Sequence, residues 1–225
     1  MSWLRNYVRE RIRWLGQSGF RIEGEQSSIY IDPWQVRSPH PADLILITHS
    51  HEDHFSPVDI EKILSARPVE YGLRGVKLSR STAVLMGPSD CEVDRDVEFQ
   101  AVAPGAFRTT KGVSIRAVSA YDLDGFHPSQ KGWVGYVLTL DGVSIYHCGD
   151  TRAILPMAGV SADIALVPVG GTHAMTLDEA IKAVEVVNAR LAIPMLTGEP
   201  RGGSEPLYAF AEACKTPVMI LPTAD

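Results

Sequence analysis

The sequence predicts one α/β domain, α+β by some schemes, made of two halves that each contribute a sheet and helices. Three observations support this prediction. The chain has 225 residues, which is long for one small domain and short for two full ones. Short β-rich runs and amphipathic helical patterns occur in both halves. No Gly-, Ser- or Pro-rich linker separates the halves, so we expect residues 1–225 to form a single domain.

In the first half, short apolar or alternating runs predict strands. They lie at residues 11–15, 19–22, 28–31 and 44–47, and again at 82–86, 98–102 and 112–119. Between the fourth and fifth runs, Pro57 stands where the first turn of a helix tolerates proline. An apolar stripe follows it, so the spacing predicts a short amphipathic helix over 57–66.

The second half opens with a hairpin. Asp141-Gly142, a turn pair typical of two-residue hairpins, separates β-rich runs at 133–140 and 143–147. Beyond it the pattern predicts strands at 163–169, 191–196 and 218–221, with helices over 177–189 and near 206–214. Thr176 and Glu179 form a capping box for the first of these helices.

Composition and charge exclude several classes of function. Hydrophobic residues make up 45% of the chain, which is typical of a globular protein. The formal charge of -6 argues against broad binding of nucleic acid. No apolar run is long enough to span a membrane, and the first residues lack the apolar stretch of a signal peptide. Three widely spaced cysteines without a CxxC pair indicate neither a disulfide framework nor a thiolate zinc site, so we expect a cytoplasmic protein.

The residues that point to chemistry follow the strand at 44–47, in the sequence THSHEDH at 48–54. His49 and His51 can point to one side and share a metal ion, while Asp53 and His54 turn toward a second position. Imidazole and carboxylate ligands suit zinc, with manganese or iron as alternatives. The competing interpretation is a polar surface loop that happens to be rich in histidine.

This motif, HSHEDH at 49–54, resembles the signature of the metallo-β-lactamase superfamily, and GDT at 149–151 resembles a later element of that family. Further segments resemble small prokaryotic metal-dependent hydrolases related to ascorbate-6-phosphate lactonases: WLG at 14–16, YIDPW at 30–34, GWVGY at 132–136, PVGGT at 168–172 and IPM at 193–195. The resemblance implies a four-layer αβ/βα sandwich with a dinuclear site where the two halves meet.

The resemblance also implies a ligand set. His49 and His51 would bind the first metal with a third histidine, for which His127 is the best match. The alternative interpretation of His127 is an exposed loop histidine without a metal. Asp53 and His54 would bind the second metal, and an aspartate at 150 would bridge both; the alternative for Asp150 is an ordinary turn aspartate.

One departure from the family affects the second metal. Relatives carry a histidine directly after IPM, where this chain has Leu196, and leucine cannot ligate a metal. His173 is the leading substitute and Glu199 another, although a surface histidine is an equally good interpretation of His173. Gln17 departs in a similar way, since relatives often have histidine after WLG.

Other residues near these motifs have two interpretations each. Asp32 either hydrogen-bonds a ligand histidine and fixes its tautomer, or is a turn residue before proline. His147 and Cys148 are expected to be buried structural residues. Arg152 and Arg201 could hold an anionic substrate group, but solvated surface arginines are the better expectation.

The resemblance implies a hydrolase that uses one or two metal ions, zinc or else manganese or iron, to activate water. Asp53 would be the catalytic acid and base, and the substrate a small ester, lactone or phosphodiester, an anionic one among the candidates. The alternative is a single-metal, catalytically weak protein with a binding or regulatory role. A nuclease is disfavoured because the chain is short and acidic. Oligomeric state has no signature in the sequence.

Overall fold

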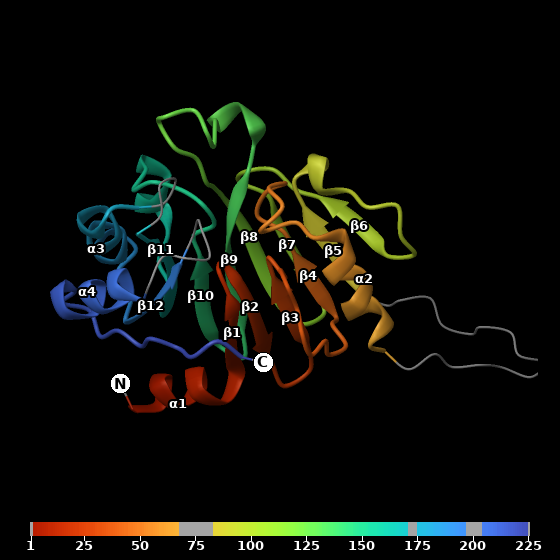
Figure 1. The fold of residues 1–225 in the computed structure, drawn as a ribbon, viewed down its shortest axis with the longest axis horizontal. Coiled ribbons are helices and arrows are strands. Elements are labelled where there is room, and N and C mark those ends of the chain that lie inside the picture. Colours follow the sequence, from red (N-terminus) through yellow and green to blue (C-terminus); the bar gives the residue numbers. More distant parts are fainter. Residues whose placement is uncertain (1, 68–82, 171–174, 197–203, 225) are drawn as a thin grey trace, which may run out of the picture.

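The computed structural model describes residues 2–67, 83–170, 175–196 and 204–224. Within this part of the chain, two six-stranded sheets lie face to face, and helices cover their outer surfaces (Figure 1). None of the helices described there is long and apolar enough to cross a membrane.

The first sheet has the order β1-β2-β3-β4-β5-β6, so neighbours in sequence are neighbours in space. Its strands β1 to β3 are antiparallel, and β3 to β6 are parallel. The strands are β1 (Ile12–Gly16), β2 (Gly19–Glu23), β3 (Ser28–Ile31), β4 (Leu44–Leu46), β5 (Val84–Gly87) and β6 (Glu98–Ala101), with helix α1 (Ser2–Arg11) before β1 and helix α2 (Pro57–Ser65) after β4.

The second sheet has the order β12-β11-β10-β9-β8-β7. Its strands β7 to β10 are antiparallel, and β10 to β12 are parallel. The strands are β7 (Phe107–Thr110), β8 (Val113–Ser119), β9 (Val134–Leu140), β10 (Val143–His147), β11 (Ile164–Val169) and β12 (Leu191–Leu196). The other helical elements are α3 (Leu177–Val186), α4 (Glu205–Ala213) and the 3-10 turns η1 (Ser89–Cys91), η2 (Ser129–Lys131) and η3 (Leu155–Gly159).

Side-chain alternation along each strand separates the core into layers. In β4, Leu44 and Leu46 face the apolar cluster between the sheets, whereas Ile45 faces outward and packs with Ile60 and Ile63 of α2. A third apolar cluster joins the outer face of the second sheet to α3 and α4. The order helix, sheet, sheet, helix is the predicted four-layer αβ/βα sandwich, which is confirmed.

Local signals were accurate where they were strong. The predicted hairpin joins β9 to β10 with Leu140 opposite Val143, and both turn residues, Asp141 and Gly142, have the positive φ of a tight two-residue turn. The capping box of α3 is present in both directions between Thr176 and Glu179. The helix ends at Val186, three residues before the predicted end.

One α-helix and one strand were not predicted, and one predicted strand is absent. Helix α1 buries only Leu4 and Val8, so its apolar face consists of two residues and gives a weak helical pattern in the sequence. Strand β7 is almost fully exposed, so its sequence does not show the alternation of apolar and polar residues that a half-buried strand has. The segment 218–221 is not a strand: Val218 pairs with Ala192 of β12, and the chain then runs to an isolated bridge with Trp14 of β1 (Figure 1). Because it joins the edges of two different sheets, it forms no continuous ladder.

The two sheets meet at the edge where β4 ends. The backbone N–H of Val134 in β9 donates to the carbonyl of Thr48, at 3.0 Å. The Tyr136 hydroxyl donates to the carbonyl of Ile47, at 2.8 Å, from a fully buried position. These contacts fix the loop after β4 against the second sheet.

Candidate metal centre

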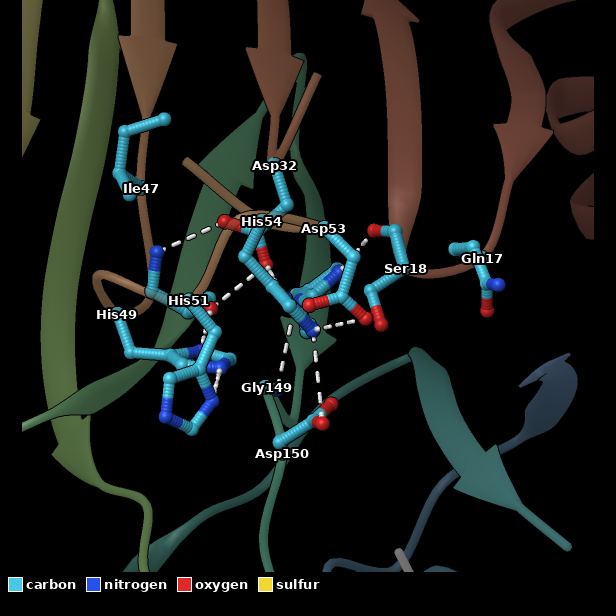
Figure 2. Close-up of polar contacts among 12 residues, drawn as sticks. Gln17, Ser18, Asp32, Ile47, His49, His51, Asp53, His54, Gly149 and Asp150 are labelled. Carbon is cyan, nitrogen blue, oxygen red and sulfur yellow. Dashed lines mark hydrogen bonds and ion pairs between the residues drawn. The ribbon is translucent and has the colours of Figure 1, made fainter. Parts of the chain in front are cut away.

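Five side chains predicted as metal ligands converge at this edge. His49, His51 and His54 come from the loop after β4, His127 from the loop after β8, and Asp150 from the loop after β10. They form two compact groups of potential ligand atoms, His49–His51–His127 and His49–His54–Asp150, with His49 in both. Figure 2 shows His54 lying between Asp32 and Asp150, with His49 and His51 beside it.

The first group consists of imidazoles alone. His49 Nε2 lies 3.1 Å from His51 Nδ1, and the His127 ring centroid is 5.0 Å from that of His49. Two nitrogens that bind the same tetrahedral zinc ion, each at about 2.0–2.1 Å, are about 3.3 Å apart from one another. The observed spacing therefore suits a shared ion. His127 is only 1% exposed, so the alternative of an exposed loop histidine is wrong.

Asp32 fixes the orientation of two of the imidazoles. It accepts hydrogen bonds from the backbone N–H of Thr48 at 2.8 Å, from the Thr48 hydroxyl at 2.6 Å and from His54 Nδ1 at 2.8 Å. Since the Thr48 hydroxyl donates to Asp32, it accepts from His49 Nδ1, 2.9 Å away. His49 therefore carries its proton on Nδ1 and presents its Nε2 lone pair to the cluster, while His54 donates from Nδ1 to Asp32 and directs Nε2 at Asp150. The predicted contact between Asp32 and a site histidine is present.

Asp122 supports His127 in the same way. This buried carboxylate accepts the backbone N–H of His127 at 2.9 Å, and His127 Nδ1 lies 3.3 Å from it. Burial lowers the pKa of His49 well below its usual value, with repulsion from His54 adding to the effect. Burial also lowers the pKa of His51 and His127, so the group is neutral, as metal-binding imidazoles are.

The second group is charged. Burial opposes a charge on His54, but the Asp150 and Asp32 carboxylates raise its pKa well above the usual value. His54 Nε2 and Asp150 Oδ2 are 3.4 Å apart, an ion pair without the alignment of a hydrogen bond. His54 Nε2 and Asp150 Oδ1 are both buried and lack a hydrogen-bond partner among the described residues. Such atoms are costly unless a ligand satisfies them, so the residues present fit a metal ion.

Asp53 belongs to neither compact group among the described residues. Its Oδ2 lies 3.7 Å from His54 Nε2, and its side chain is 36% exposed. It therefore stands on the solvent side of the second group, within reach of both the cluster and an incoming substrate.

His147 and Cys148 are structural, as expected. His147 is fully buried, and its Nε2 donates to the carbonyl of Ser18 at 2.8 Å while its Nδ1 accepts the backbone N–H of Gly149 at 3.1 Å. Both ring nitrogens are thus used, and the contact ties β10 to the β1–β2 turn. Cys148 points the other way, into the apolar layer beneath the outer helices.

Arg152 is not a free anion-binding group. It pairs with Asp124 at 2.9 Å and with Glu179 at 3.0 Å. The other residues proposed to complete the site, His173 and Glu199, lie outside the described residues, as does Arg201. The backbone of Leu196 ends β12 opposite Val169 of β11.

Three residues that shape the site were not predicted from the sequence: Asp122, Asp90 and Trp133. Asp90 accepts from the Ser50 hydroxyl at 2.9 Å and from the Trp133 indole N–H at 3.1 Å. The Trp133 ring lies against His49 and His51, with ring centroids 5.0 and 4.7 Å apart. Only Asp122, five residues before His127, had a sequence signal, because a nearby carboxylate often orients a ligand histidine.

Sequence comparison gives consistent findings. The family model described as the beta-lactamase superfamily domain matches residues 11–196. A protein named UPF0173 metal-dependent hydrolase, from Thermococcus onnurineus, is 34% identical over 209 residues, covering 82% of this chain and 83% of that protein. Its namesake from Thermofilum pendens is 28% identical and covers 96% of this chain and 97% of its own length.

Solved structures share the architecture. The metallo-beta-lactamase fold protein YhfI from Bacillus subtilis has a TM-score of 0.74 at 14% identity, over 96% of this chain and 97% of that one. A novel metallo hydrolase from Ignicoccus hospitalis has a TM-score of 0.71 at 21% identity, over 96% of each chain. At these identities the likeness shows the fold alone.

Proposed function

Since the chain belongs to the beta-lactamase superfamily and to the UPF0173 metal-dependent hydrolase family, we propose that it is a metal-dependent hydrolase of small molecules. The observation that carries this proposal is the convergence of two ligand groups that share His49. Nitrogen and oxygen donors of this kind suit zinc, with manganese or iron as alternatives.

The residues divide the work between two positions. His49, His51 and His127 would hold one ion, and His54 and Asp150 would hold a second beside it. A bound ion of this kind supplies Lewis acidity, which lowers the pKa of water from about 15.7 to roughly 7 and polarises a carbonyl or phosphoryl oxygen. Asp32 and Asp122 hold the imidazoles in the orientation in which they would bind such ions.

Asp53 would move the proton. Its carboxylate lies on the open side of the cluster, where it can accept a proton from the attacking water and return it to the leaving group. No side-chain nucleophile is needed, and a small ester, lactone or phosphodiester satisfies this chemistry. The chain's charge of -6 disfavours nucleic acid as the substrate.

Asp53→Asn tests the proposal. It should lower metal-dependent turnover of an activated ester by about 10²- to 10⁴-fold, because asparagine cannot carry the proton. The matched control is Glu52→Gln, which neutralises the exposed neighbouring carboxylate and should keep full activity. Unchanged turnover in Asp53→Asn, with the same metal content, would contradict the role.

A second candidate is a single-metal protein with weak or no catalysis. It is favoured by the leucine at position 196, since leucine cannot bind metal and the resemblance to the family implies a histidine at this position. Elemental analysis of protein purified without chelator separates the two: two ions per chain support the hydrolase, and one ion lost with His127→Ala supports the alternative.

A further inference from the structure

The loop that carries His127 is held rigidly at its base. One backbone hydrogen bond closes the loop, in which the N–H of Asp122 donates to the carbonyl of His127 at 2.9 Å. The Asp122 carboxylate accepts the N–H groups of Gly125 at 2.7 Å and His127 at 2.9 Å. Asp124 on the same loop pairs with Arg152. The loop conformation is therefore set before any substrate arrives.

This rigid loop displays two large apolar side chains. Leu123 is 84% exposed and Phe126 is 49% exposed. The Phe126 ring centroid lies 4.9 Å from the ring of His51 and 4.9 Å from the ring of His127, so it adjoins the metal-binding imidazoles directly. We call Leu123 and Phe126 the apolar rim. Single exposed apolar residues are common, but two on one anchored loop beside a candidate active site indicate a contact surface.

The cations that the described residues place near this rim are already engaged: Lys131 Nζ lies over the Trp133 ring, 5.7 Å from its centroid. Asp53 and Asp150 both carry carboxylates on the cluster side. Arg152 is paired with Asp124 and Glu179, so its guanidinium is already neutralised. An uncharged apolar group needs no charged partner there.

We infer that the substrate is an uncharged carboxylic ester or lactone whose alkyl or aryl group packs on the apolar rim. This inference rests on the proposed hydrolase function and adds the substrate class. Phe126, beside the ligand histidines, and Leu123, three residues earlier on the same loop, determine specificity by removing the apolar group from water. Each methylene fully buried there contributes about fourfold in binding.

The test compares p-nitrophenyl acetate, p-nitrophenyl hexanoate and bis-p-nitrophenyl phosphate on the purified, metal-containing protein. We expect kcat/KM to favour the hexanoate over the acetate by about tenfold or more, with the phosphodiester poorest. Phe126→Ala and Leu123→Ala should each reduce the hexanoate preference several-fold, whereas Phe126→Leu should keep it. Metal content is measured for every variant, so that loss of metal is not mistaken for loss of specificity.

Trp3→Ala is the matched control. Trp3 is 47% exposed, a fraction similar to that of Phe126. It lies on α1, which leads into the start of β1. That end of the first sheet is opposite to the end that carries the site. Trp3→Ala should leave the preference unchanged. A hexanoate preference that survives both Phe126→Ala and Leu123→Ala, or faster cleavage of the phosphodiester, would overturn the inference.

A binding measurement separates this inference from the proposed function. If none of the three substrates is cleaved, the hydrolase proposal fails, and titration calorimetry with p-nitrophenyl hexanoate against p-nitrophenyl acetate still tests the rim. Tighter binding of hexanoate that is lost in Phe126→Ala supports the apolar rim. Equal binding of both, or hexanoate binding unaffected by Phe126→Ala, overturns it.

Discussion

The two ligand groups share His49 but differ in charge and surroundings. The group of His49, His51 and His127 is neutral, because burial lowers the pKa of each ring, and aromatic side chains pack against it. The group around His54 and Asp150 is charged and contains buried polar atoms without hydrogen-bond partners among the described residues.

This difference separates two ways of preparing a metal site. In the imidazole group, hydrogen bonds within the protein already orient the rings, so only the ion is needed to complete the site. In the charged group, a proton on His54 compensates the buried carboxylates until an ion replaces it. We therefore expect the two positions to respond differently when their supports are removed.

The largest effect should come from His49→Ala, because His49 belongs to both groups. Loss of this ligand should weaken metal binding at both positions by more than about 100-fold, since removing even a supporting residue costs 10- to 100-fold. Elemental analysis after dialysis against chelator-free buffer measures this loss. His40→Ala, at an exposed position, is the control and should keep its metal. An undiminished metal content in His49→Ala would show that neither group binds the ion.

Asp32→Asn and Asp122→Asn should separate the two groups. Asp32 has φ +44°, a conformation that asparagine tolerates, so the substitution removes charge without imposing backbone strain. It touches His54 directly and His49 through Thr48, and should weaken metal binding by about 10- to 100-fold.

Asp122 supports His127 alone, through a longer 3.3 Å contact, so Asp122→Asn should cost about tenfold or less. Competition with a chromogenic chelator gives both affinities. A larger loss in Asp122→Asn than in Asp32→Asn would reverse the ranking drawn from the hydrogen bonds.

The smallest effect should come from Arg152→Met. Arg152 links the loop of Asp150 to the loop of His127 through Asp124, and to α3 through Glu179. Its partners are partly exposed, so each pair contributes about 1 kcal/mol or less to the free energy of unfolding. Urea denaturation should show a loss of about 1 kcal/mol, with metal content retained. Loss of metal from Arg152→Met would mean that this link, rather than Asp32 and Asp122, positions the ligands.

Much of the architecture could be predicted from local sequence. Strand alternation, the Asp141-Gly142 turn and the Thr176–Glu179 capping box each depend on residues a few positions apart, so their signals are complete within a short window. Elements with little burial gave little signal, which explains why β7 was missed. The segment 218–221 has strand-like composition, but its pairing is divided between two sheet edges.

For the metal centre, the sequence by itself determined the residue types, their order and the motif at 49–54 that indicates a metal. Only the tertiary structure decided which atoms meet. Asp32 reaches His54 across 22 positions, Asp90 reaches Trp133 across 43, and Arg152 is committed to Asp124 and Glu179. Such contacts depend on how strands pair within a sheet and how the two sheets pack face to face, and the spacing of residues along the chain does not reveal which of them become neighbours in space.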